Sequence, residues 1–416
     1  MTSEIFAWIW LPGHTRPTLA GRLVAAEGRY LFQYSRRYLE HRDAIPIFWE
    51  LPLQPGVIEP AAGLTLPGCL RDAAPDAWGR RIIEYQHGEI DLDETVYLLD
   101  AGSDRVGALD FGLSPTRHTA NTSNEVSLET FQEAVHCLET DQPLPEALKQ
   151  ALLHGTSIGG ARPKMLLEDD NRKWIAKFSL STDRYPVVRM EYLGMRLAQE
   201  AGIETAHVKL EEVGGKDILL VERFDRENTP GGWQRKPMVS ALTVLGIDEM
   251  MARYASYKTL ADICRARGRK EDTGALFTRL VFNIIIGNTD DHARNHAFFW
   301  DGEQITLVPA YDICPQGRTG RRAGQAMSID GRDNRSQLSL CIEAAMDFLL
   351  DREEARRLVL DQVETVKAHW DRLLRESRLA HEEERLRGKV VLSPYIVEDM
   401  DPDDPIRKAV MDFSGQ

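Results

Sequence analysis

The sequence lacks the features that mark secreted, disulfide-stapled or membrane-spanning proteins. Its five cysteines are odd in number, widely scattered and without a Cys-x-x-Cys pair, so neither a disulfide framework nor a zinc ribbon is indicated. The longest apolar run, around Val281 to Ile286, is far too short to cross a bilayer, and the N-terminus has no basic start before a long apolar segment. We therefore expect a soluble, unsecreted, cytoplasmic protein.

The chain also has fewer basic than acidic residues. The chain has 51 Lys and Arg residues against 65 Asp and Glu residues, a net charge of −14. Proteins that mainly bind nucleic-acid backbones present a surplus of Lys and Arg, so direct DNA binding is not expected to be the main role. The 416 residues, 43% of them hydrophobic and without an internal repeat, are enough for two or three packed units.

The first third of the chain predicts a β-rich unit and a connector. Short apolar stretches alternate with Pro and Gly up to about residue 113, with a helical run at Ala77 to Tyr85. The polar stretch from Ser114 to Glu125 has no aromatic residue and is typical of an exposed connector, which predicts a domain boundary there. A helical pattern from Ser127 to Leu153 follows.

Two hairpins with a helix between them are predicted next. Apolar stretches flank the turn-forming residues Asp169 to Arg172, and another pair flanks Gly214-Gly215. Between them, Arg189 to Ala201 carries apolar residues at helical spacing and stops at Gly202. The chain is largely helical from about Asp248 onward. The predicted fold class is α+β, with the strand-rich lobe followed by a helical lobe that is typical of kinase-like folds.

Two features in the strand-rich region suit a nucleotide's phosphates. The paired glycines of Ser157 to Lys164 allow backbone N–H groups to approach an anion, although Gly-Gly pairs also simply make turns. Lys177 follows on a strand whose residues Trp174, Ala176 and Phe178 supply the apolar face. The lysine either caps the strand in water or reaches a phosphate. Glu191 on the next helix is either its ion-pair partner or an exposed helical glutamate.

The strongest local signal is an apolar helix that breaks at Gly287 into a polar loop. Asp290 and Asn295 have the Asp-x-x-x-x-Asn spacing of a kinase catalytic loop, where the aspartate accepts a hydroxyl proton and the asparagine binds metal. Asp312 ends a later apolar stretch and is placed to be a second magnesium ligand. For both aspartates the alternative is a side chain that caps a turn.

The same loop permits a competing interpretation as a zinc site. His292 and His296 are four residues apart, so on a helix they would share one face and bind zinc with a carboxylate. The glutamate of a His-Glu-x-x-His motif is missing, and the helix is expected to end before His292. A zinc hydrolase is therefore disfavoured.

Taken together, the motifs resemble the HipA family of toxin kinases over nearly the whole chain. Residues 72–81 look like the Leu-Pro-Asp-Gly-Trp-Gly-Arg-Arg signature of that family's N-terminal subdomain. The glycine-rich loop, Glu191-Tyr192, the stretch from Val221 to Arg226, the stretch from Thr289 to Asn295 and Tyr311-Asp312 follow in the family's order. The implied domains are an N-terminal subdomain at 1–118, a kinase N-lobe at 127–226 and a helical C-lobe at 227–416.

The resemblance implies a role for each matched position. Asp290 would be the catalytic base, Lys177 the phosphate-contacting lysine, and Asn295 and Asp312 the magnesium ligands. The remaining ATP contacts would come from the glycine-rich loop, from a hinge that meets adenine through backbone groups, and from two residues lining the nucleotide site: Ser157, Gly159, Gly160, Ala161, Arg162 and Lys164; Glu222, Arg223 and Phe224; His292 and Tyr311.

The resemblance also implies regulation and partners. Ser157 would be an autophosphorylation site whose modification expels the loop and switches the enzyme off, with Thr156 as an adjacent alternative acceptor. A phosphate adds about −1.5 to −2 charge, which should repel the nucleotide's own phosphates. Family members pair with a small helix-turn-helix antitoxin, HipB, that binds operator DNA, and phosphorylate aminoacyl-tRNA synthetases. One departure is Asp291, where the family usually has glycine; its carboxylate either affects metal binding or points to solvent.

We therefore expect a magnesium- and ATP-dependent serine/threonine protein kinase that acts as a toxin. One alternative is a small-molecule kinase with the same two lobes. Another is a non-catalytic corepressor bound to antitoxin and DNA.

Overall fold

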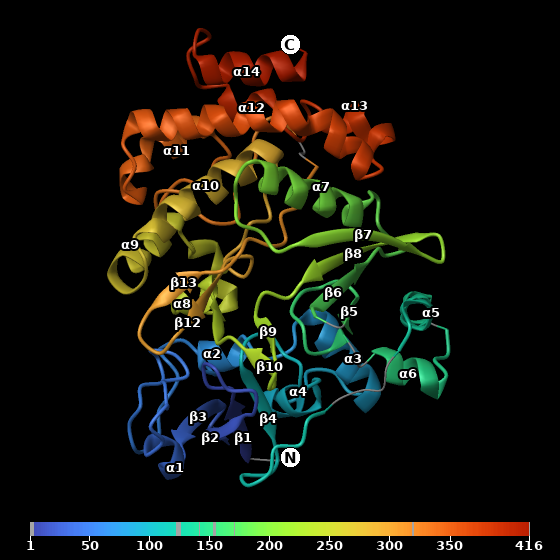
Figure 1. Ribbon diagram of the computed structural model, residues 1–416, viewed down its shortest axis with the longest axis vertical. Coiled ribbons are helices and arrows are strands. Elements are labelled where there is room, and N and C mark those ends of the chain that lie inside the picture. Colours follow the sequence, from blue (N-terminus) through green and yellow to red (C-terminus); the bar gives the residue numbers. More distant parts are fainter. Residues whose placement is uncertain are drawn as a thin grey trace. The chain divides into compact units, whose positions relative to one another are not determined.

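The computed structural model describes residues 4–121, 126–140, 142–152, 155–169, 171–317 and 320–415 (Figure 1). The chain forms two compact units: unit 1 is Met1–Arg184, Glu211–Val239 and Phe299–Glu303, and unit 2 is Tyr185–Leu210, Ser240–Phe298 and Gln304–Gln416. Residues 122–125 of the predicted connector, residue 153 of the predicted helical run and Asp170 of the first predicted turn lie outside the described residues. The three predicted domains, 1–118, 127–226 and 227–416, stay a prediction.

Unit 1 begins with an antiparallel sheet of order β3-β2-β1-β4. Its strands are β1 (Glu4–Ile9), β2 (Thr18–Ala26), β3 (Arg29–Tyr34) and β4 (Leu109–Gly112), and its helices are α1 (Arg36–Leu39), α2 (Gly68–Arg71), α3 (Ala77–His87) and α4 (Glu94–Asp100). A Cβ at Gly21 of β2 would lie 2.2 Å from the Gln33 carbonyl oxygen, so only glycine allows this close pairing. The predicted helix at Ala77 is confirmed and ends at Gly88.

The second sheet, whose strands belong to unit 1 except for the first residues of β7, confirms both predicted hairpins. Its strands are β5 (Lys164–Glu168), β6 (Lys173–Phe178), β7 (Val208–Val213) and β8 (Lys216–Glu222), in the order β5-β6-β8-β7. The turn glycines Gly214 and Gly215 both have positive φ, as a tight connection between β7 and β8 requires. A smaller hairpin of β9 (Arg226–Thr229) and β10 (Gly232–Arg235) follows.

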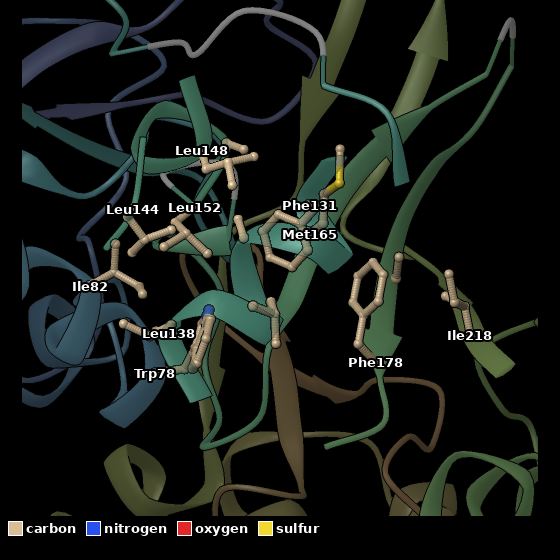
Figure 2. Close-up of a cluster of buried hydrophobic side chains, with 14 residues drawn as sticks. Trp78, Ile82, Phe131, Leu138, Leu144, Leu148, Leu152, Met165, Phe178 and Ile218 are labelled. Atoms are coloured by element: carbon tan, nitrogen blue, oxygen red, sulfur yellow. The ribbon is translucent and has the colours of Figure 1, made fainter. Parts of the chain in front are cut away.

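One hydrophobic core joins the second sheet to helices from both sides of the connector (Figure 2). Trp78 and Ile82 of α3 pack with Phe131 of α5 (Leu128–Glu139), α6 (Glu146–Leu152) and Phe178 of β6. The helical pattern predicted from Ser127 to Leu153 is confirmed, and the structure divides it into two helices, α5 and α6. Two prolines lie between them, at positions 143 and 145, and each removes a backbone donor and disfavours a continuous helix.

Unit 2 is mostly helical, as predicted. Its elements are α7 (Val187–Glu200), α8 (Ala241–Val244), η2 (Glu249–Tyr254), α9 (Tyr257–Arg267), α10 (Glu271–Ile286), α11 (Leu338–Glu343), η3 (Ala345–Phe348), α12 (Arg352–Glu376), η4 (Ala380–Glu382), α13 (Glu383–Leu386), η5 (Pro394–Val397) and α14 (Pro405–Ser414), with the short strands β11 (Met238–Ser240), β12 (Ala297–Trp300) and β13 (Ile305–Leu307) near the division. The long helix α12 packs against α7 and α14 (Figure 1). Within the described ranges, no helix is both long and apolar enough to cross a membrane.

Candidate active site

The predicted phosphate cradle is a tight turn that leads into β5 in unit 1. Gly160 has a φ of +112°, a conformation that side-chain-bearing residues rarely adopt, and its N–H donates to Asp76 Oδ2 at 2.5 Å. A Cβ on Gly159 would lie 2.7 Å from the same oxygen. The buried Lys164 ammonium donates to the Gly159 carbonyl oxygen. The two glycines therefore admit an anionic group to the loop backbone, and here that group is the Asp76 carboxylate.

Both candidate phosphoacceptors of this loop are buried within unit 1. The exposed fraction of Ser157 is 4%, and its Oγ donates to the Asp104 carbonyl oxygen at 3.3 Å. Thr156 is fully buried, and its Oγ1 accepts from the Gly102 N–H at 3.2 Å. Phosphate transfer to either hydroxyl would therefore require the loop to leave this arrangement.

Lys177 lies where the strand alternation predicted. Trp174, Ala176 and Phe178 of β6 are buried, while Lys177 is half-buried on the opposite face with Ile175. The lysine is therefore not a freely solvated residue at the end of a strand. Its role as a phosphate contact stays a prediction.

The other side chains of the glycine-rich loop differ in their surroundings. Arg162 forms an ion pair with Asp183 at 2.8 Å, and the same carboxylate accepts from the Leu180 N–H. Ala161, between Gly160 and Arg162, is exposed. The guanidinium of Arg162 is thus already held by a carboxylate of its own unit.

The predicted hinge, Glu222 to Phe224, is at the end of β8. The Glu222 and Phe224 side chains are half-buried, whereas Arg223 is buried. The Arg223 backbone N–H donates to the Lys173 carbonyl oxygen at 2.8 Å. Contact of this segment with adenine stays a prediction, and the Arg223 amide would have to give up a strand hydrogen bond to take part.

The Arg223 side chain belongs to a buried cluster of charges in unit 1. Its Nε and Nη2 donate to the Asp225 carboxylate at 3.0 and 2.9 Å, and Arg226 donates to the same group at 2.8 Å. Asp104 accepts from both arginines. Burial alone would raise the pKa of Asp225, but the charges of Arg223 and Arg226 lower it to about 2. The Arg223 guanidinium therefore has a structural role inside unit 1, where it binds buried carboxylates.

In unit 2, α10 ends where the sequence predicted and releases the candidate catalytic loop. Gly287 has a φ of +71° and caps the helix, and a Cβ there would lie 2.6 Å from the Val390 carbonyl oxygen. Asp290 is exposed, whereas the next residue, Asp291, has an exposed fraction of only 1%. The expectation that Asp291 points to solvent is therefore wrong.

Backbone and side-chain hydrogen bonds hold the rest of this loop. Asn295 donates through Nδ2 to the Asp290 carbonyl oxygen at 2.8 Å, and the Arg294 N–H donates to His292 Nδ1 at 3.2 Å. Tyr311 reaches back from the later segment, and its hydroxyl donates to the Arg294 carbonyl oxygen at 2.8 Å. The structure thus connects His292, Asn295 and Tyr311 to the backbone of the loop that carries Asp290.

Asp312 follows Tyr311 in an unusual backbone conformation. Its φ of +59° lies in the left-handed region, which a non-glycine residue adopts only when its surroundings enforce it. Although Asp290 is exposed, partial desolvation of its carboxyl group raises its pKa, the His292 charge lowers it, and the Asp312 charge raises it. The carboxylates of Asp290 and Asp312 are therefore close enough to influence each other.

The donors of this region suit a hard cation. Asn295, Tyr311 and Asp312 line one cavity with Asn288 and Ala310. Carboxylate and amide oxygens are the ligands magnesium prefers, and it typically takes one or two carboxylates together with substrate phosphates. Among the described residues there is no cluster of three or more His, Cys, Asp and Glu side chains for a metal. The residues thus fit magnesium that is also held by a nucleotide, rather than a cage made by protein alone.

Sequence reasoning missed several residues of this cavity, among them Arg279 on α10. It is buried, its Nη2 donates to the Val308 carbonyl oxygen at 2.5 Å, and its Nε and Nη1 have no hydrogen-bond partner. Burial lowers its pKa to about 10. An arginine inside an otherwise apolar helical run was the available signal, because charged residues are rarely buried without a reason.

The zinc interpretation of this loop finds no support in the geometry. His292 and His296 lie beyond the end of α10, so they do not share a helix face. His292 Nδ1 accepts from the Arg294 N–H, and His296 Nε2 lies 3.1 Å from the Tyr257 hydroxyl. Burial lowers the pKa of His296 to about 3, so its ring is neutral.

Glu191 on α7 is buried in unit 2, with an exposed fraction of 5%. The alternative of an ordinary exposed helical glutamate is therefore wrong. A buried carboxylate requires polar or charged partners, as the ion-pair role would provide. That role stays a prediction.

The fold and these residues define a class of protein. A glycine-rich loop and a strand lysine lie in a sheet-rich unit, and an Asp-x-x-x-x-Asn loop with a second aspartate lies in a helical unit, which is the organisation of kinase-like proteins. Residues 156–370 match the HipA-like C-terminal domain, and residues 10–112 match the HipA N-terminal domain. The chain belongs to the HipA family.

Two relatives show how far the similarity extends. The chain is 27% identical over 188 residues to the serine/threonine-protein kinase toxin HipA of Shewanella oneidensis, which covers 38% of this chain and 42% of that protein. It is 21% identical over 340 residues to the toxin YjjJ of Escherichia coli, which covers 76% of this chain and 71% of that protein. The alignment with the first relative thus spans less than half of its length.

A solved structure confirms the fold class. A chain of the Shewanella oneidensis complex of HipA, HipB and operator DNA matches with a TM-score of 0.65 and 18% identity, over 96% of both chains. The predicted HipA-like α+β fold, β-rich at the start and helical toward the end, is therefore correct.

Proposed function

We propose that this protein is a serine/threonine protein kinase that uses ATP and magnesium and acts as the toxin of a toxin–antitoxin pair. The observation that carries the proposal is the gathering of Asp290, Asn295 and Asp312, from two separate segments of unit 2. Asn295 binds the Asp290 backbone, and desolvation, together with the Asp312 charge, raises the pKa of Asp290. Asn295 and Asp312 line one cavity. Membership of the HipA family supports the same activity.

Each residue has a role in the proposed reaction. Asp290 is exposed, and its raised pKa suits a carboxylate that accepts the proton of the attacking hydroxyl. Lys177 contacts the phosphates, and the loop from Ser157 to Lys164 covers them. Asn295 and Asp312 would hold magnesium, which would supply positive charge against the developing negative charge of the transferring phosphoryl group.

Adenine would be bound by the backbone of Glu222 to Phe224, at the end of β8. His292 and Tyr311 would line the nucleotide site. Both form hydrogen bonds with the Arg294 backbone, which would hold Asn295 and Asp290 in position.

Autophosphorylation of Ser157 would switch the kinase off. Its hydroxyl is buried against the Asp104 carbonyl oxygen, where a phosphate of about −1.5 to −2 charge cannot be accommodated without displacing the loop. Incubation with magnesium and ATP should add the mass of one phosphate, and Ser157→Ala should abolish the addition. If the alanine variant is modified equally, the autophosphorylation site is another residue, and Thr156 would be the first candidate to test.

The partners are proposed from the relatives. A chain of a HipA, HipB and operator DNA complex shares this fold, so a HipB-like DNA-binding antitoxin is the proposed partner, and DNA would be met through it. The acidic net charge of −14 agrees with DNA affinity supplied by a partner. The proposed substrate is a translation-related protein such as an aminoacyl-tRNA synthetase.

The test is Asp290→Asn, which keeps the side-chain size and removes the base. Transfer of labelled phosphate from ATP to protein should fall on the order of 10³-fold, with affinity for ATP changed less than about threefold. Asp403→Asn, which removes an exposed carboxylate paired with Lys408, is the matched control and should leave the rate unchanged. Transfer by Asp290→Asn within a factor of about three of the wild type would contradict the proposal. Label found on metabolites instead of proteins would favour the small-molecule kinase.

A further inference from the structure

Asp290 and Asp291 are neighbours in the chain but lie in opposite surroundings. Asp290 is exposed at the candidate site, whereas Asp291 is buried beneath the loop. The two residues share one planar peptide unit, so holding the Asp291 backbone in place also restrains the Asp290 backbone. Burying a carboxyl group costs free energy unless hydrogen bonds replace those it made with water.

The Asp291 carboxyl group accepts hydrogen bonds from three different segments of the chain. The Tyr257 hydroxyl, at the start of α9, donates to Oδ2 at 2.5 Å, and Asn283 Nδ2 on α10 lies 3.4 Å from the same oxygen. The Ala326 backbone N–H, beyond Asp312 in the chain, donates to Oδ1 at 3.3 Å. Asp291 therefore ties the loop to two helices and to the segment that follows Asp312.

A second set of bonds extends this attachment to both ends of the loop. Tyr257 lies 3.1 Å from His296 Nε2, at the far end of the loop. At the near end, Asn288 Nδ2 donates to Asn283 Oδ1 at 3.1 Å, and the Asn288 carbonyl oxygen accepts from Gln325 at 2.9 Å. Removing the Asp291 carboxyl group would leave the Tyr257 hydroxyl and the Asn283 amide buried without this acceptor.

We infer that Asp291 is a positioning residue for Asp290. Its buried carboxyl group anchors the backbone that the two residues share, and Asn295 holds the Asp290 carbonyl oxygen. The inference rests on the proposed kinase function and identifies a determinant of its rate. Asp291 lines the same cavity as Asn295 and Asp312, but its carboxyl oxygens accept hydrogen bonds from Tyr257, Asn283 and Ala326, so we assign it a positioning role. Its contribution is geometric, and a displacement of about 1 Å at a reacting group costs on the order of 10²-fold in rate.

The first test separates positioning from general stability by kinetics. Asp291→Ala should lower kcat by about 10- to 100-fold and leave the KM for ATP within about twofold. Asp291→Asn retains an acceptor for Tyr257 and should stay within about threefold of the wild-type kcat. The matched control is Asp272→Ala: Asp272 is another buried aspartate of unit 2, which accepts from the Leu307 N–H and pairs with Arg269, away from the loop. It should lose stability but keep kcat within about twofold.

The second test does not depend on activity. Hydrogen exchange of the backbone amides of residues 288–296 should be faster in Asp291→Ala than in the wild type. The exchange rate of these amides should be unchanged in Asp272→Ala and close to the wild-type rate in Asp291→Asn. Unchanged exchange in Asp291→Ala, an unchanged kcat, or an asparagine variant as impaired as alanine would each overturn the inference. A wild-type protein that transfers no phosphate would defeat the proposed function instead, and the exchange experiment would still decide whether Asp291 anchors the loop.

Discussion

The buried charge cluster of unit 1 leads to a quantitative prediction for Asp225→Asn. The carboxylate accepts four hydrogen bonds, from Gly107, Arg226 and twice from Arg223, and the asparagine keeps its shape but not its charge. Lowering the pKa from the ordinary 3.8 to about 2 corresponds to about 2.5 kcal/mol of unfolding free energy at neutral pH. We expect the variant to lose at least that amount, because two buried guanidinium groups also lose a charged partner.

The pH dependence gives the prediction its sign. A carboxylate whose pKa is lower in the folded state stabilises the fold above its unfolded pKa, and the stabilisation disappears as pH falls through the folded value. The difference between wild type and Asp225→Asn should therefore be full at pH 7 and shrink from about pH 5 toward pH 2.

The measurement is urea unfolding at several pH values, followed by circular dichroism and by tryptophan fluorescence. The fluorescence comes mainly from tryptophans of unit 1, among them Trp10, whose ring centroid lies 3.6 Å from the Arg235 guanidinium. Glu40→Gln, which removes an exposed ion pair with Arg36, is the control and should change stability by less than about 0.5 kcal/mol. A loss below about 1 kcal/mol for Asp225→Asn, or a difference that persists unchanged at low pH, would refute the assignment of the cluster as a stabilising network.

Three further predictions concern the two candidate loops. Gly79→Ala places a Cβ 2.4 Å from the Thr156 carbonyl oxygen and should destabilise the protein by about 1–3 kcal/mol, with faster proteolysis of the glycine-rich loop; equal melting temperatures would contradict the close packing. Tyr311→Phe removes the bond to the Arg294 carbonyl oxygen and should cost about 1 kcal/mol in stability, measured by denaturant unfolding. Burial raises the pKa of Asp291 to about 7, so wild-type stability should decline between about pH 4 and pH 8 relative to Asp291→Asn, and parallel curves would show that this carboxyl group does not titrate as proposed.

Local patterns predicted the elements that carry the site. Alternation along β6 correctly placed Lys177 opposite the buried face, and Gly287 correctly marked the end of α10. These signals act within a few residues, because strand pleat and helix caps depend on near neighbours. The order of sheet and helices followed from the same signals.

Partners distant in the chain were beyond local patterns. The burial of Asp291 depends on Tyr257, 34 residues earlier, and that of Arg223 on Asp104, 119 residues earlier. Charged residues are usually exposed, so sequence alone favours the wrong surroundings for both. The split between α5 and α6 shows a local signal, two nearby prolines, that the helical periodicity obscured.

The core of Figure 2 limits how this chain can be dissected. A fragment that stopped at residue 118 would carry Trp78 and Ile82 without the helices and strands that cover them, and a fragment that started at residue 127 would open the other side of the same core. Each aromatic or aliphatic side chain exposed in this way would lower the free energy of unfolding by about 1.5–3 kcal/mol. The exposed apolar patch would also promote aggregation. Fragments made for crystallisation or labelling should therefore keep α3 and the second sheet on one polypeptide.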